Sequence, residues 1–360
     1  MVIANTMSDV LNAVKRLKIE HLKYKNMKRR VSAVLQAMFV GELAVIAGPP
    51  RVGKTRSVRD ALAISDFPQP DENELMPVVI VEAANEGTSG EFSTKGFAMD
   101  CLRAIRHPIF GIADENDPWE VKLNERLERT PERRLWSAFE QALILRKTEY
   151  FVIDEAHHVR YVRGGDEAAA KVLDSWKCLA NIAKVKLVLI GSYKLLPLMS
   201  LAPHLLGRQL PLEFARYKSS SMEDIREWEK ALRRFSELIP FNDNESLSTW
   251  NRYLFEGSMG RIGGLSSWLR GALAKMIAED ADRMTIEFLQ ASRMPAQQEE
   301  TIFEEIVEGE KYLLRQQTPL PIGAEQALES TPSTRASNDS KGRGTPFRRS
   351  PKRNVRDGRA

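Results

Sequence analysis

Five short apolar runs alternate with helical patterns over the first 218 residues, and this alternation restricts the possible folds more than any other feature. The runs are almost continuously hydrophobic, as strands are when helices cover both faces of their sheet. They occupy residues 41–48, 76–83, 148–156, 184–192 and 209–216. Helical spacing of apolar residues occurs over residues 55–64, 95–106, 132–147, 166–182 and 194–207. This alternation predicts the α/β class, with a parallel five-stranded sheet flanked by helices.

The pattern changes near residue 219, after which helical spacing continues without further strand-like runs. Ser221 and Asp224 provide a helix start of the capping-box type. From about residue 318, Pro, Ser, Gly and Arg dominate, and this composition predicts disorder. The expected segments are a basic helical N-terminal arm (1–35), the core that holds the sheet (36–218), an all-helical lid (219–318) and a disordered basic tail (319–360).

Basic residues gather at both ends of the chain. Residues 1–30 hold eight Lys and Arg against two acidic residues, and residues 331–360 hold nine against two. These ends therefore carry +6 and +7, and the net charge of +4 requires −9 in between. Basic ends commonly contact nucleic acid or an acidic partner, but they also serve as a solubilising fringe, and both interpretations remain open at this point.

The cysteine count and the hydropathy pattern indicate where in the cell the protein is expected to be. Cys101 and Cys178 are far apart and lie outside any CxxC motif, which argues against a disulfide framework and against a zinc site. No apolar run approaches the roughly 18 residues of a membrane helix, and the first residues lack the pattern of a secretory signal. We therefore expect a cytoplasmic protein without a membrane partner.

The stretch Gly48–Thr55 has the sequence GPPRVGKT and follows the first apolar run. A helical stretch follows it, which is the context that the phosphate-binding pattern G-x-x-x-x-G-K-[ST] requires. Gly48 and Gly53 are expected to allow turns that aim backbone N–H groups at an anion. Lys54 is expected to reach the β- and γ-phosphates of ATP, and the Thr55 hydroxyl to bind Mg²⁺. The residues predicted to hold the nucleotide are Gly48, Pro49, Pro50, Arg51, Val52, Gly53, Lys54 and Thr55.

Two acidic residues end the third apolar run, in the string YFVIDEAHH. Ligands of open parallel sheets bind at the carboxyl ends of the strands, where this pair is expected to lie. Asp154 would hold the magnesium through water, and Glu155 would polarise the water that attacks the γ-phosphate. The sequence therefore predicts an enzyme, a Mg²⁺-dependent ATPase. The string DEAH also occurs in helicases, but these need two sheet domains, and only helices follow residue 219 here.

Three further polar residues complete the predicted site. Ser192 ends the fourth run beside the acidic pair, where it can sense the γ-phosphate or simply cap the strand. Arg208 precedes the fifth run and is placed to act on the nucleotide of a neighbouring subunit. Arg261, in the string GSMGRIGGL, is placed to act on its own subunit's nucleotide. A plain surface role remains the alternative for each arginine.

This arrangement resembles the AAA+ P-loop NTPases, and more closely the TnsC/TniB-type regulators of DNA transposition. The similarity extends from about residue 30 to 275 and is carried by PVVIVEAANEGTSGEFSTKGF, RLWSAFEQAL, FVIDEAHHV, LVLIGSYKLLPLM and RQLPLEFARYK. The nucleotide motifs are shared by many AAA+ proteins, whereas the strings around GSYKLL and LEFARY are narrower. The prolines at positions 49 and 50 depart from the commoner serine and glycine and would stiffen the loop.

The resemblance implies a bacterial protein that binds ATP and assembles into rings or helical filaments on double-stranded DNA. Such proteins connect a target-site selector to the transposase of a mobile genetic element. Ser192, Arg208 and Arg261 match the first sensor, the arginine finger that acts in trans and the second sensor. Independently of the family, a DNA coat needs only backbone contacts. The candidates on loops that would face a central channel are Ser93, Thr94, Lys95, Arg160 and Arg163.

Two other functions share many of these features. A helicase loader or initiator-like DNA-binding ATPase would have the same nucleotide motifs, and an initiator usually adds a DNA-reading domain. A non-enzymatic scaffold would bind ATP only to assemble, and it would not need the hydrolytic carboxylate predicted at Glu155.

Overall fold

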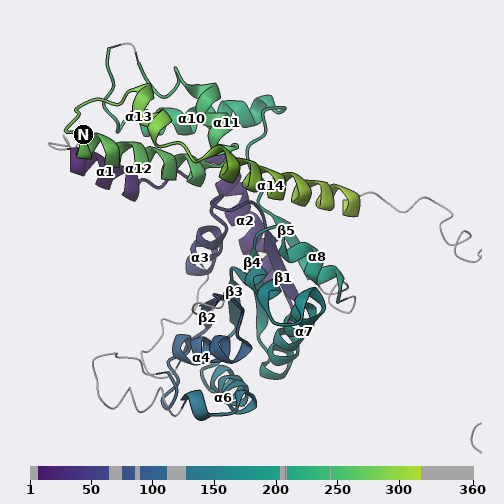
Figure 1. Ribbon diagram of the computed structural model, residues 1–360. Helices are drawn as coiled ribbons and strands as arrows, with labels where there is room; N and C mark the ends of the chain where they lie inside the picture. The colour runs from purple at the N-terminus through teal and green to yellow at the C-terminus, as the bar shows by residue number, and fades with distance from the viewer. Residues whose placement is uncertain are drawn as a thin grey trace, which may run out of the picture. The chain divides into compact units, whose positions relative to one another are not determined.

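The computed structural model describes residues 7–64, 75–85, 90–111, 127–202, 207, 209–243 and 245–317. Five parallel strands form one sheet in the order β2-β3-β4-β1-β5 (Figure 1). The strands are β1 (Leu43–Ala47), β2 (Val78–Glu82), β3 (Tyr150–Asp154), β4 (Lys186–Gly191) and β5 (Gln209–Glu213). The predicted parallel five-stranded sheet is therefore confirmed, with each strand inside its predicted apolar run.

Helices cover both faces of the sheet, which explains the unbroken hydrophobicity of the strands. In β1, Leu43 and Val45 face one hydrophobic cluster, and Ala44 and Ile46 face the other. The first cluster includes residues of α4 (Thr94–Ala104), α6 (Glu132–Leu145), α7 (Gly165–Ala183) and α8 (Leu195–Ser200). The second includes residues of α2 (Leu22–Ala37) and α3 (Lys54–Ile64).

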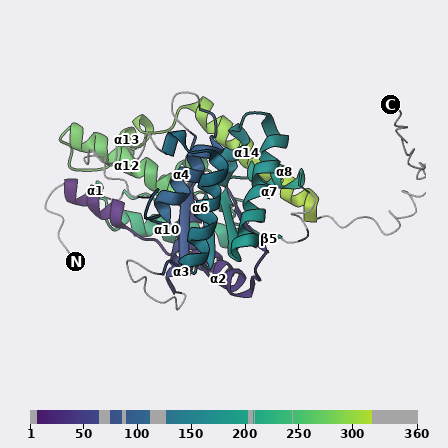
Figure 2. The ribbon, with the colours of Figure 1, turned by 90° about the horizontal axis from the view of Figure 1, so that it is seen from below.

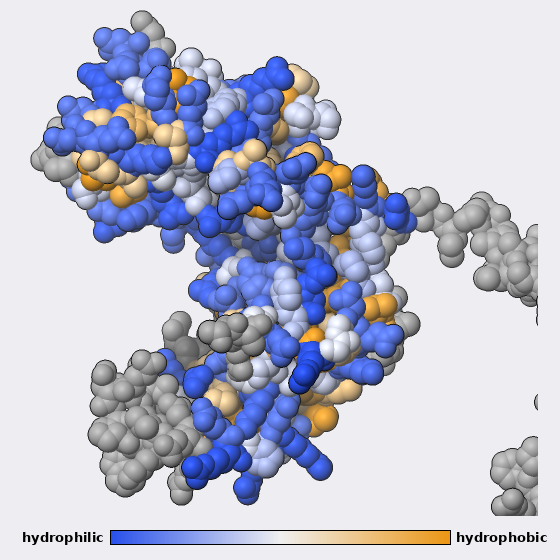
Figure 3. All heavy atoms as spheres, in the orientation of Figure 1, coloured by the Kyte–Doolittle hydropathy of each residue, from blue (hydrophilic) through white to orange (hydrophobic). Residues whose placement is uncertain are grey.

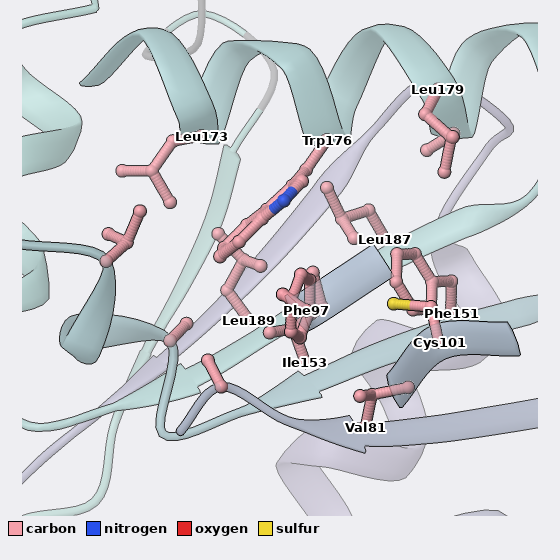
Figure 4. Packing of buried hydrophobic residues seen from close by; sticks show 14 of the residues in the cluster. Val81, Phe97, Cys101, Phe151, Ile153, Leu173, Trp176, Leu179, Leu187 and Leu189 are labelled. Carbon is pink, nitrogen blue, oxygen red and sulfur yellow. The ribbon is translucent and has the colours of Figure 1, made fainter. Parts of the chain in front are cut away.

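The larger cluster centres on Trp176 of α7, which is almost completely buried. Figure 4 shows its ring beside Phe97 and above the strand residues Leu187 and Leu189. The ring centroids of Phe97 and Trp176 lie 5.0 Å apart, a favourable separation for aromatic pairs. Truncating a side chain of this size in a close-packed core costs about 3–5 kcal/mol, so α7 is firmly attached to the sheet.

The helices after residue 219 have a hydrophobic core of their own. They are α10 (Met222–Ser236), α11 (Asn251–Ser258), α12 (Ile262–Ala278) and α13 (Ile286–Ala291). The Ser221 side chain caps α10 by accepting the Asp224 N–H at 3.2 Å, as the sequence predicts. Helix α1 (Met7–Arg16) contributes Val10 and Val14 to the same core. The N-terminal basic segment is thus divided, because α1 packs with the lid and α2 packs on the sheet.

A long C-terminal helix, α14 (Ala296–Gln317), returns from the lid to the sheet core. Its Ile306 is fully buried in the larger cluster, and Glu305 forms an ion pair with Lys194 at 2.8 Å. At Gly309 a Cβ atom would lie 2.1 Å from Cγ of Tyr193, so only glycine permits this contact. None of the described helices has both the length and the apolar character needed to cross a lipid bilayer.

Candidate nucleotide site

The loop between β1 and α3 contains two residues in the left-handed region. Gly53 has a φ of 104°, which glycine adopts at low cost, and Arg51 also lies in the left-handed region with a φ of 61°. Gly48, by contrast, does not have a left-handed φ. Its small size serves a close approach instead, since a Cβ there would lie 2.5 Å from the carbonyl oxygen of Phe214, just after β5.

Lys54 begins α3 and is buried. Its Nζ donates hydrogen bonds to the carbonyl oxygens of Gly48 at 2.9 Å and Pro49 at 2.8 Å. Burial lowers the pKa of Lys54 to about 8, although the carboxylates of Glu155 and Asp154 act in the opposite direction. The ammonium group is thus held inside the curve of the loop. A bound anion would neutralise its charge there and would accept hydrogen bonds in place of the water that burial removes.

The acidic pair lies at the carboxyl end of β3, where the sequence predicts it. Asp154 is buried, and its Oδ1 accepts the backbone N–H of Glu155 at 2.9 Å. Glu155 has a φ of 50°, an uncommon conformation for a residue with a Cβ and one that often marks functional sites. Burial raises the pKa of Glu155, while the Lys54 ammonium opposes this shift.

His157 connects the ends of β3 and β4. Its Nδ1 accepts the Ser192 N–H at 3.3 Å and lies 3.2 Å from Oε2 of Glu155. Burial lowers the pKa of His157 to about 4, so the imidazole is neutral at physiological pH. Because Nδ1 already accepts a hydrogen bond from the backbone, it carries no proton to donate to Glu155, and the close approach is not an ion pair. The Glu155 carboxylate therefore remains able to bind water.

Ser192 is buried next to this histidine, so the structure brings the end of β4 beside the acidic pair. Its hydroxyl oxygen accepts the Lys194 N–H at 3.3 Å. The side chain thus has a local capping role in the turn that follows β4. Arg208, the predicted finger, lies outside the described residues.

Arg261 connects the lid to the phosphate loop. Its side chain is buried, and it donates to the carbonyl oxygens of Ser258 at 3.0 Å and Pro50 at 3.4 Å. Burial, reinforced by Arg51 and Arg216, lowers the pKa of Arg261 to about 10. Gly263 also approaches the loop, since a Cβ there would lie 2.1 Å from the carbonyl oxygen of Arg51. The first turn of α12 is thus in contact with the loop.

A cavity of about 410 Å³ extends from Gly53 toward the N-terminal segment. Its lining includes His21, Tyr24, Arg51, Arg56, Ile262 and Arg270. The aromatic and apolar groups beside the phosphate loop provide room for the nucleoside part of a nucleotide. The motifs in the sequence do not identify His21 and Tyr24 as site residues. The only signal is a pair of aromatic rings within the basic segment, and it becomes meaningful once α2 is known to pack beside α3.

Arg216 is a second residue that motif analysis does not find. Its Nε and Nη2 donate to the two carboxylate oxygens of Glu310 in α14, at 3.0 and 3.3 Å. Its guanidinium is close enough to lower the pKa of Arg261. The string LEFARYK contains Arg216, but its role depends on a partner that lies 94 residues away in the sequence.

The five candidate DNA-contact residues lie in two segments that the structure brings together, but not all on loops as predicted, because Thr94 and Lys95 belong to α4 and Arg160 to a 3₁₀ helix. The Phe92 N–H donates to the carbonyl oxygen of Tyr161 at 3.1 Å, which joins the segment after β2 to the 3₁₀ helix η2 (Ala156–Tyr161). Ser93 caps α4 by accepting the Gly96 N–H, Thr94 begins that helix, and Lys95 donates to the Glu128 carbonyl. Arg160 is half-buried and Arg163 is exposed.

The oxygen groups of Thr55 and Asp154 fit the predicted magnesium ion. Mg²⁺ prefers oxygen ligands and is commonly held by one or two protein groups together with substrate phosphates. Asp154 supplies a buried carboxylate, and Thr55 lies in the first turn of α3. The described part of the chain contains no group of three or more His, Cys, Asp or Glu residues that could bind a metal by themselves. A magnesium ion that arrives with ATP would suit this site.

The parallel five-stranded sheet and the loop between β1 and α3 have the AAA+ P-loop fold of ATP-hydrolysing enzymes. Residues 38–199 match the family described as an AAA domain. Among solved structures, the chain is similar to the ORC1 protein of Aeropyrum pernix in complex with DNA, with 16% identity, a TM-score of 0.54, and coverage of 79% of this chain and 67% of that one. It is also similar to Cdc6p from Pyrobaculum aerophilum, with 11% identity, a TM-score of 0.50, and coverage of 79% and 70%. At these identities the likeness shows the fold. No curated protein sequence matches the chain.

Proposed function

We propose that this ATPase oligomerises on double-stranded DNA and regulates transposition, linking a target-site selector to a transposase. The contact between Arg261 and the Pro50 carbonyl carries the proposal, because it joins the phosphate loop to the lid. A nucleotide that changes the loop therefore also changes the lid, and so the surface available to neighbouring subunits. The similarity to TnsC/TniB-type regulators, in the strings around GSYKLL and LEFARY, supports transposition as the process.

In the proposed reaction, Lys54 exchanges its carbonyl partners for the β- and γ-phosphates of ATP. Glu155 orients the attacking water, and its raised pKa suits a group that takes up a proton as the bond to the γ-phosphate breaks. Thr55 and Asp154 would hold Mg²⁺, which supplies charge neutralisation at the phosphates when bound. Ser192, which lies beside the acidic pair at the end of β4, would report the presence of the γ-phosphate.

Assembly would complete the site. Arg208 is proposed to reach the nucleotide of the adjacent subunit, and an arginine supplied in this way stabilises the charge of the transition state. Hydrolysis would then follow assembly and limit its lifetime. The adjacent segments that carry Ser93, Thr94, Lys95, Arg160 and Arg163 would contact the DNA backbone.

An initiator-like ATPase or helicase loader is the alternative. The similarity in fold to an ORC1 protein solved with DNA and to a Cdc6p favours it. The two functions differ in whether they require a particular DNA sequence. A transposition regulator that coats DNA through backbone contacts would bind unrelated duplexes equally well, whereas an initiator would prefer one sequence.

Electron microscopy of the protein with duplex DNA and a non-hydrolysable ATP analogue tests the proposal. We expect a continuous protein coat or a ring around the duplex, and no assembly with Lys54→Ala. Glu155→Gln should assemble with ATP itself and persist, because hydrolysis is blocked. Coats formed equally well by Lys54→Ala, or isolated monomers under all conditions, would contradict the proposal. Competition with unrelated duplexes, and stimulation of strand transfer by a transposase, would separate the two functions.

A further inference from the structure

The exposed face of α2 carries cations without acidic neighbours on the same helix. The sequence of α2, LKYKNMKRRVSAVLQA, contains five Lys and Arg and no Asp or Glu. Its apolar side is buried against the sheet through Tyr24, Met27, Val31 and Leu35. The opposite side is therefore fixed toward solvent and presents Lys25, Arg29 and Arg30, with Lys28 half-exposed.

Helix α3 lies beside α2 and extends this charged surface (Figures 1 and 2). Arg59 is exposed on α3, and its neighbour Asp60 is engaged by the Tyr24 hydroxyl at 2.5 Å. Arg56 forms an ion pair with the same aspartate, with 3.7 Å between its Nε and the Oδ2 of Asp60. Hydrophilic residues cover most of the described surface that Figure 3 shows. We refer to Lys25, Lys28, Arg29, Arg30 and Arg59 together as the cationic ridge.

The ridge differs from several exposed lid cations in how its charges are satisfied. Lys230 pairs with Glu227 and Arg252 with Glu256. Within the described ranges, no residue of the ridge forms an ion pair with a carboxylate. Arg29 donates to the Asn26 side chain and Arg30 to the Glu213 carbonyl, both uncharged acceptors. Adjacent unpaired cations repel one another, so an external polyanion would stabilise this surface.

We propose that the cationic ridge binds the phosphate backbone of double-stranded DNA. Lys25 and Arg29 are one helical turn apart, about 6 Å along the axis, so the two cations can contact different phosphates of one DNA backbone. Asn26 lies between them and offers an amide, a group that also donates to phosphate oxygens. The proposal rests on the proposed DNA-bound function and adds a second surface to it. The channel-loop candidates lie on or next to elements of the other helical layer.

A membrane with anionic lipids is the alternative partner for a cationic surface, and it would need an exposed apolar face beside the charges. A helix that lies in a membrane interface buries its apolar face in lipid, but that face of α2 is already buried in the protein. The residues Phe39 and Val40 that follow α2 are 75% and 53% exposed, so anionic vesicles are the comparison to include. Association with DNA releases counterions, which gives a steep and measurable dependence on salt.

The test compares two variants of equal charge. The ridge variant combines Lys25→Gln, Arg29→Gln and Arg59→Gln, which leave the nucleotide site and the Arg30–Glu213 contact intact. The control variant combines Lys230→Gln, Arg234→Gln and Arg252→Gln, three exposed lid cations that form ion pairs. Fluorescence anisotropy would follow each protein with a labelled duplex and a non-hydrolysable ATP analogue over a salt series. Thermal melting and ATP turnover without DNA would verify that both variants fold and function.

We expect the ridge variant to bind DNA about ten- to a hundredfold more weakly, with the slope of log K against log salt reduced by about 2–3. The control should bind as the wild type does. Equal affinity and slope for the ridge variant would overturn the ridge proposal and leave the proposed function standing. A wild type that binds no duplex would overturn both. Loss of vesicle binding, rather than DNA binding, in the ridge variant would assign the surface to a membrane and overturn the proposal.

Discussion

The guanidinium of Arg261 donates to the Pro50 carbonyl at 3.4 Å, which attaches the first turn of the lid helix α12 to the phosphate loop. The arginine is buried and has no carboxylate partner in the part of the chain that the structure describes. Such a charge is costly to bury, and burial accordingly lowers its pKa. A phosphate group bound to the loop would supply the missing negative charge.

We predict that Arg261→Met lowers ATP turnover by at least tenfold, because the charge that faces the nucleotide is lost. The free energy of unfolding should change by less than about 1 kcal/mol, since an apolar side chain replaces a buried unpaired charge. Coupled-enzyme ATPase assays and urea denaturation measure the two quantities. Arg252→Met is the matched control, because Arg252 is exposed and should leave both unchanged. Full turnover by Arg261→Met would refute the assignment.

Two adjacent glycines of α12 test the approach of the lid to the loop. Gly263→Ala would place a Cβ 2.1 Å from the Arg51 carbonyl oxygen, whereas Gly264→Ala places one 3.4 Å from its nearest neighbour, the Ser258 carbonyl oxygen. We expect the first substitution to displace the loop and weaken nucleotide binding by about tenfold, an effect of about 1.4 kcal/mol. The second should leave binding intact and add up to about 1 kcal/mol of helix stability. Titration calorimetry with ADP compares them, and equal affinities would count against the contact.

The packing of α14 against the sheet core depends on Gly309. Gly309→Ala would drive a Cβ against the Tyr193 ring, so the helix should shift and the protein lose about 1–3 kcal/mol of unfolding free energy. Gly271→Ala in α12 is the control, since its Cβ would meet Ser292 at an ordinary 3.6 Å. Hydrogen exchange should increase over residues 300–314 in the first variant only. Unchanged protection there would show that α14 packs differently from the structure described.

His21 should make stability depend on pH. Its Nδ1 lies 2.8 Å from the Tyr217 hydroxyl and accepts the Tyr24 N–H at 3.3 Å, which caps α2. Burial lowers the pKa of His21 from 6.5 to about 4, so the folded protein holds this residue neutral where the unfolded chain protonates it. The stabilisation is complete above pH 6.5 and is lost as the pH falls through 4.

Relative to His21→Asn, the wild type should lose about 2 kcal/mol more unfolding free energy between pH 7 and pH 5. Asparagine retains a capping oxygen but does not titrate. Burial also lowers the pKa of His157 and of His107, but both variants contain these residues, so their contributions cancel in the difference. Urea denaturation at several pH values measures the effect, and parallel pH profiles would contradict it.

Features that depend on local spacing could be predicted from the sequence. The parallel sheet follows from the alternation of strands and helices, and the GPPRVGKT loop and the acidic end of β3 lie where the motifs place them. Features that depend on distant partners could not. Gly48 is needed because Phe214 passes over it, and Arg216 is held by a glutamate of α14. The basic N-terminal segment likewise divides between two cores because its apolar residues match two different surfaces.

The roles assigned to Ser192, Arg208 and the channel loops stay predictions, for a similar physical reason. A sensor and a finger act on a bound nucleotide or across a subunit boundary, and neither relationship is encoded in the spacing along one chain. The Ser192 hydroxyl, for example, has a sufficient local partner in the Lys194 N–H. Only a changed partner in the presence of a γ-phosphate would distinguish sensing from capping.

The Tyr193 ring lies in the path of any movement at the end of β4. It is pressed against the backbone of α14 on one side, and its hydroxyl is fixed to Glu213 at 2.7 Å. A displacement of Ser192 during the ATPase cycle would therefore push α14, because the Tyr193 ring is already in contact with the backbone of that helix. Through this contact, a change at the nucleotide would alter how α14 packs on the sheet core.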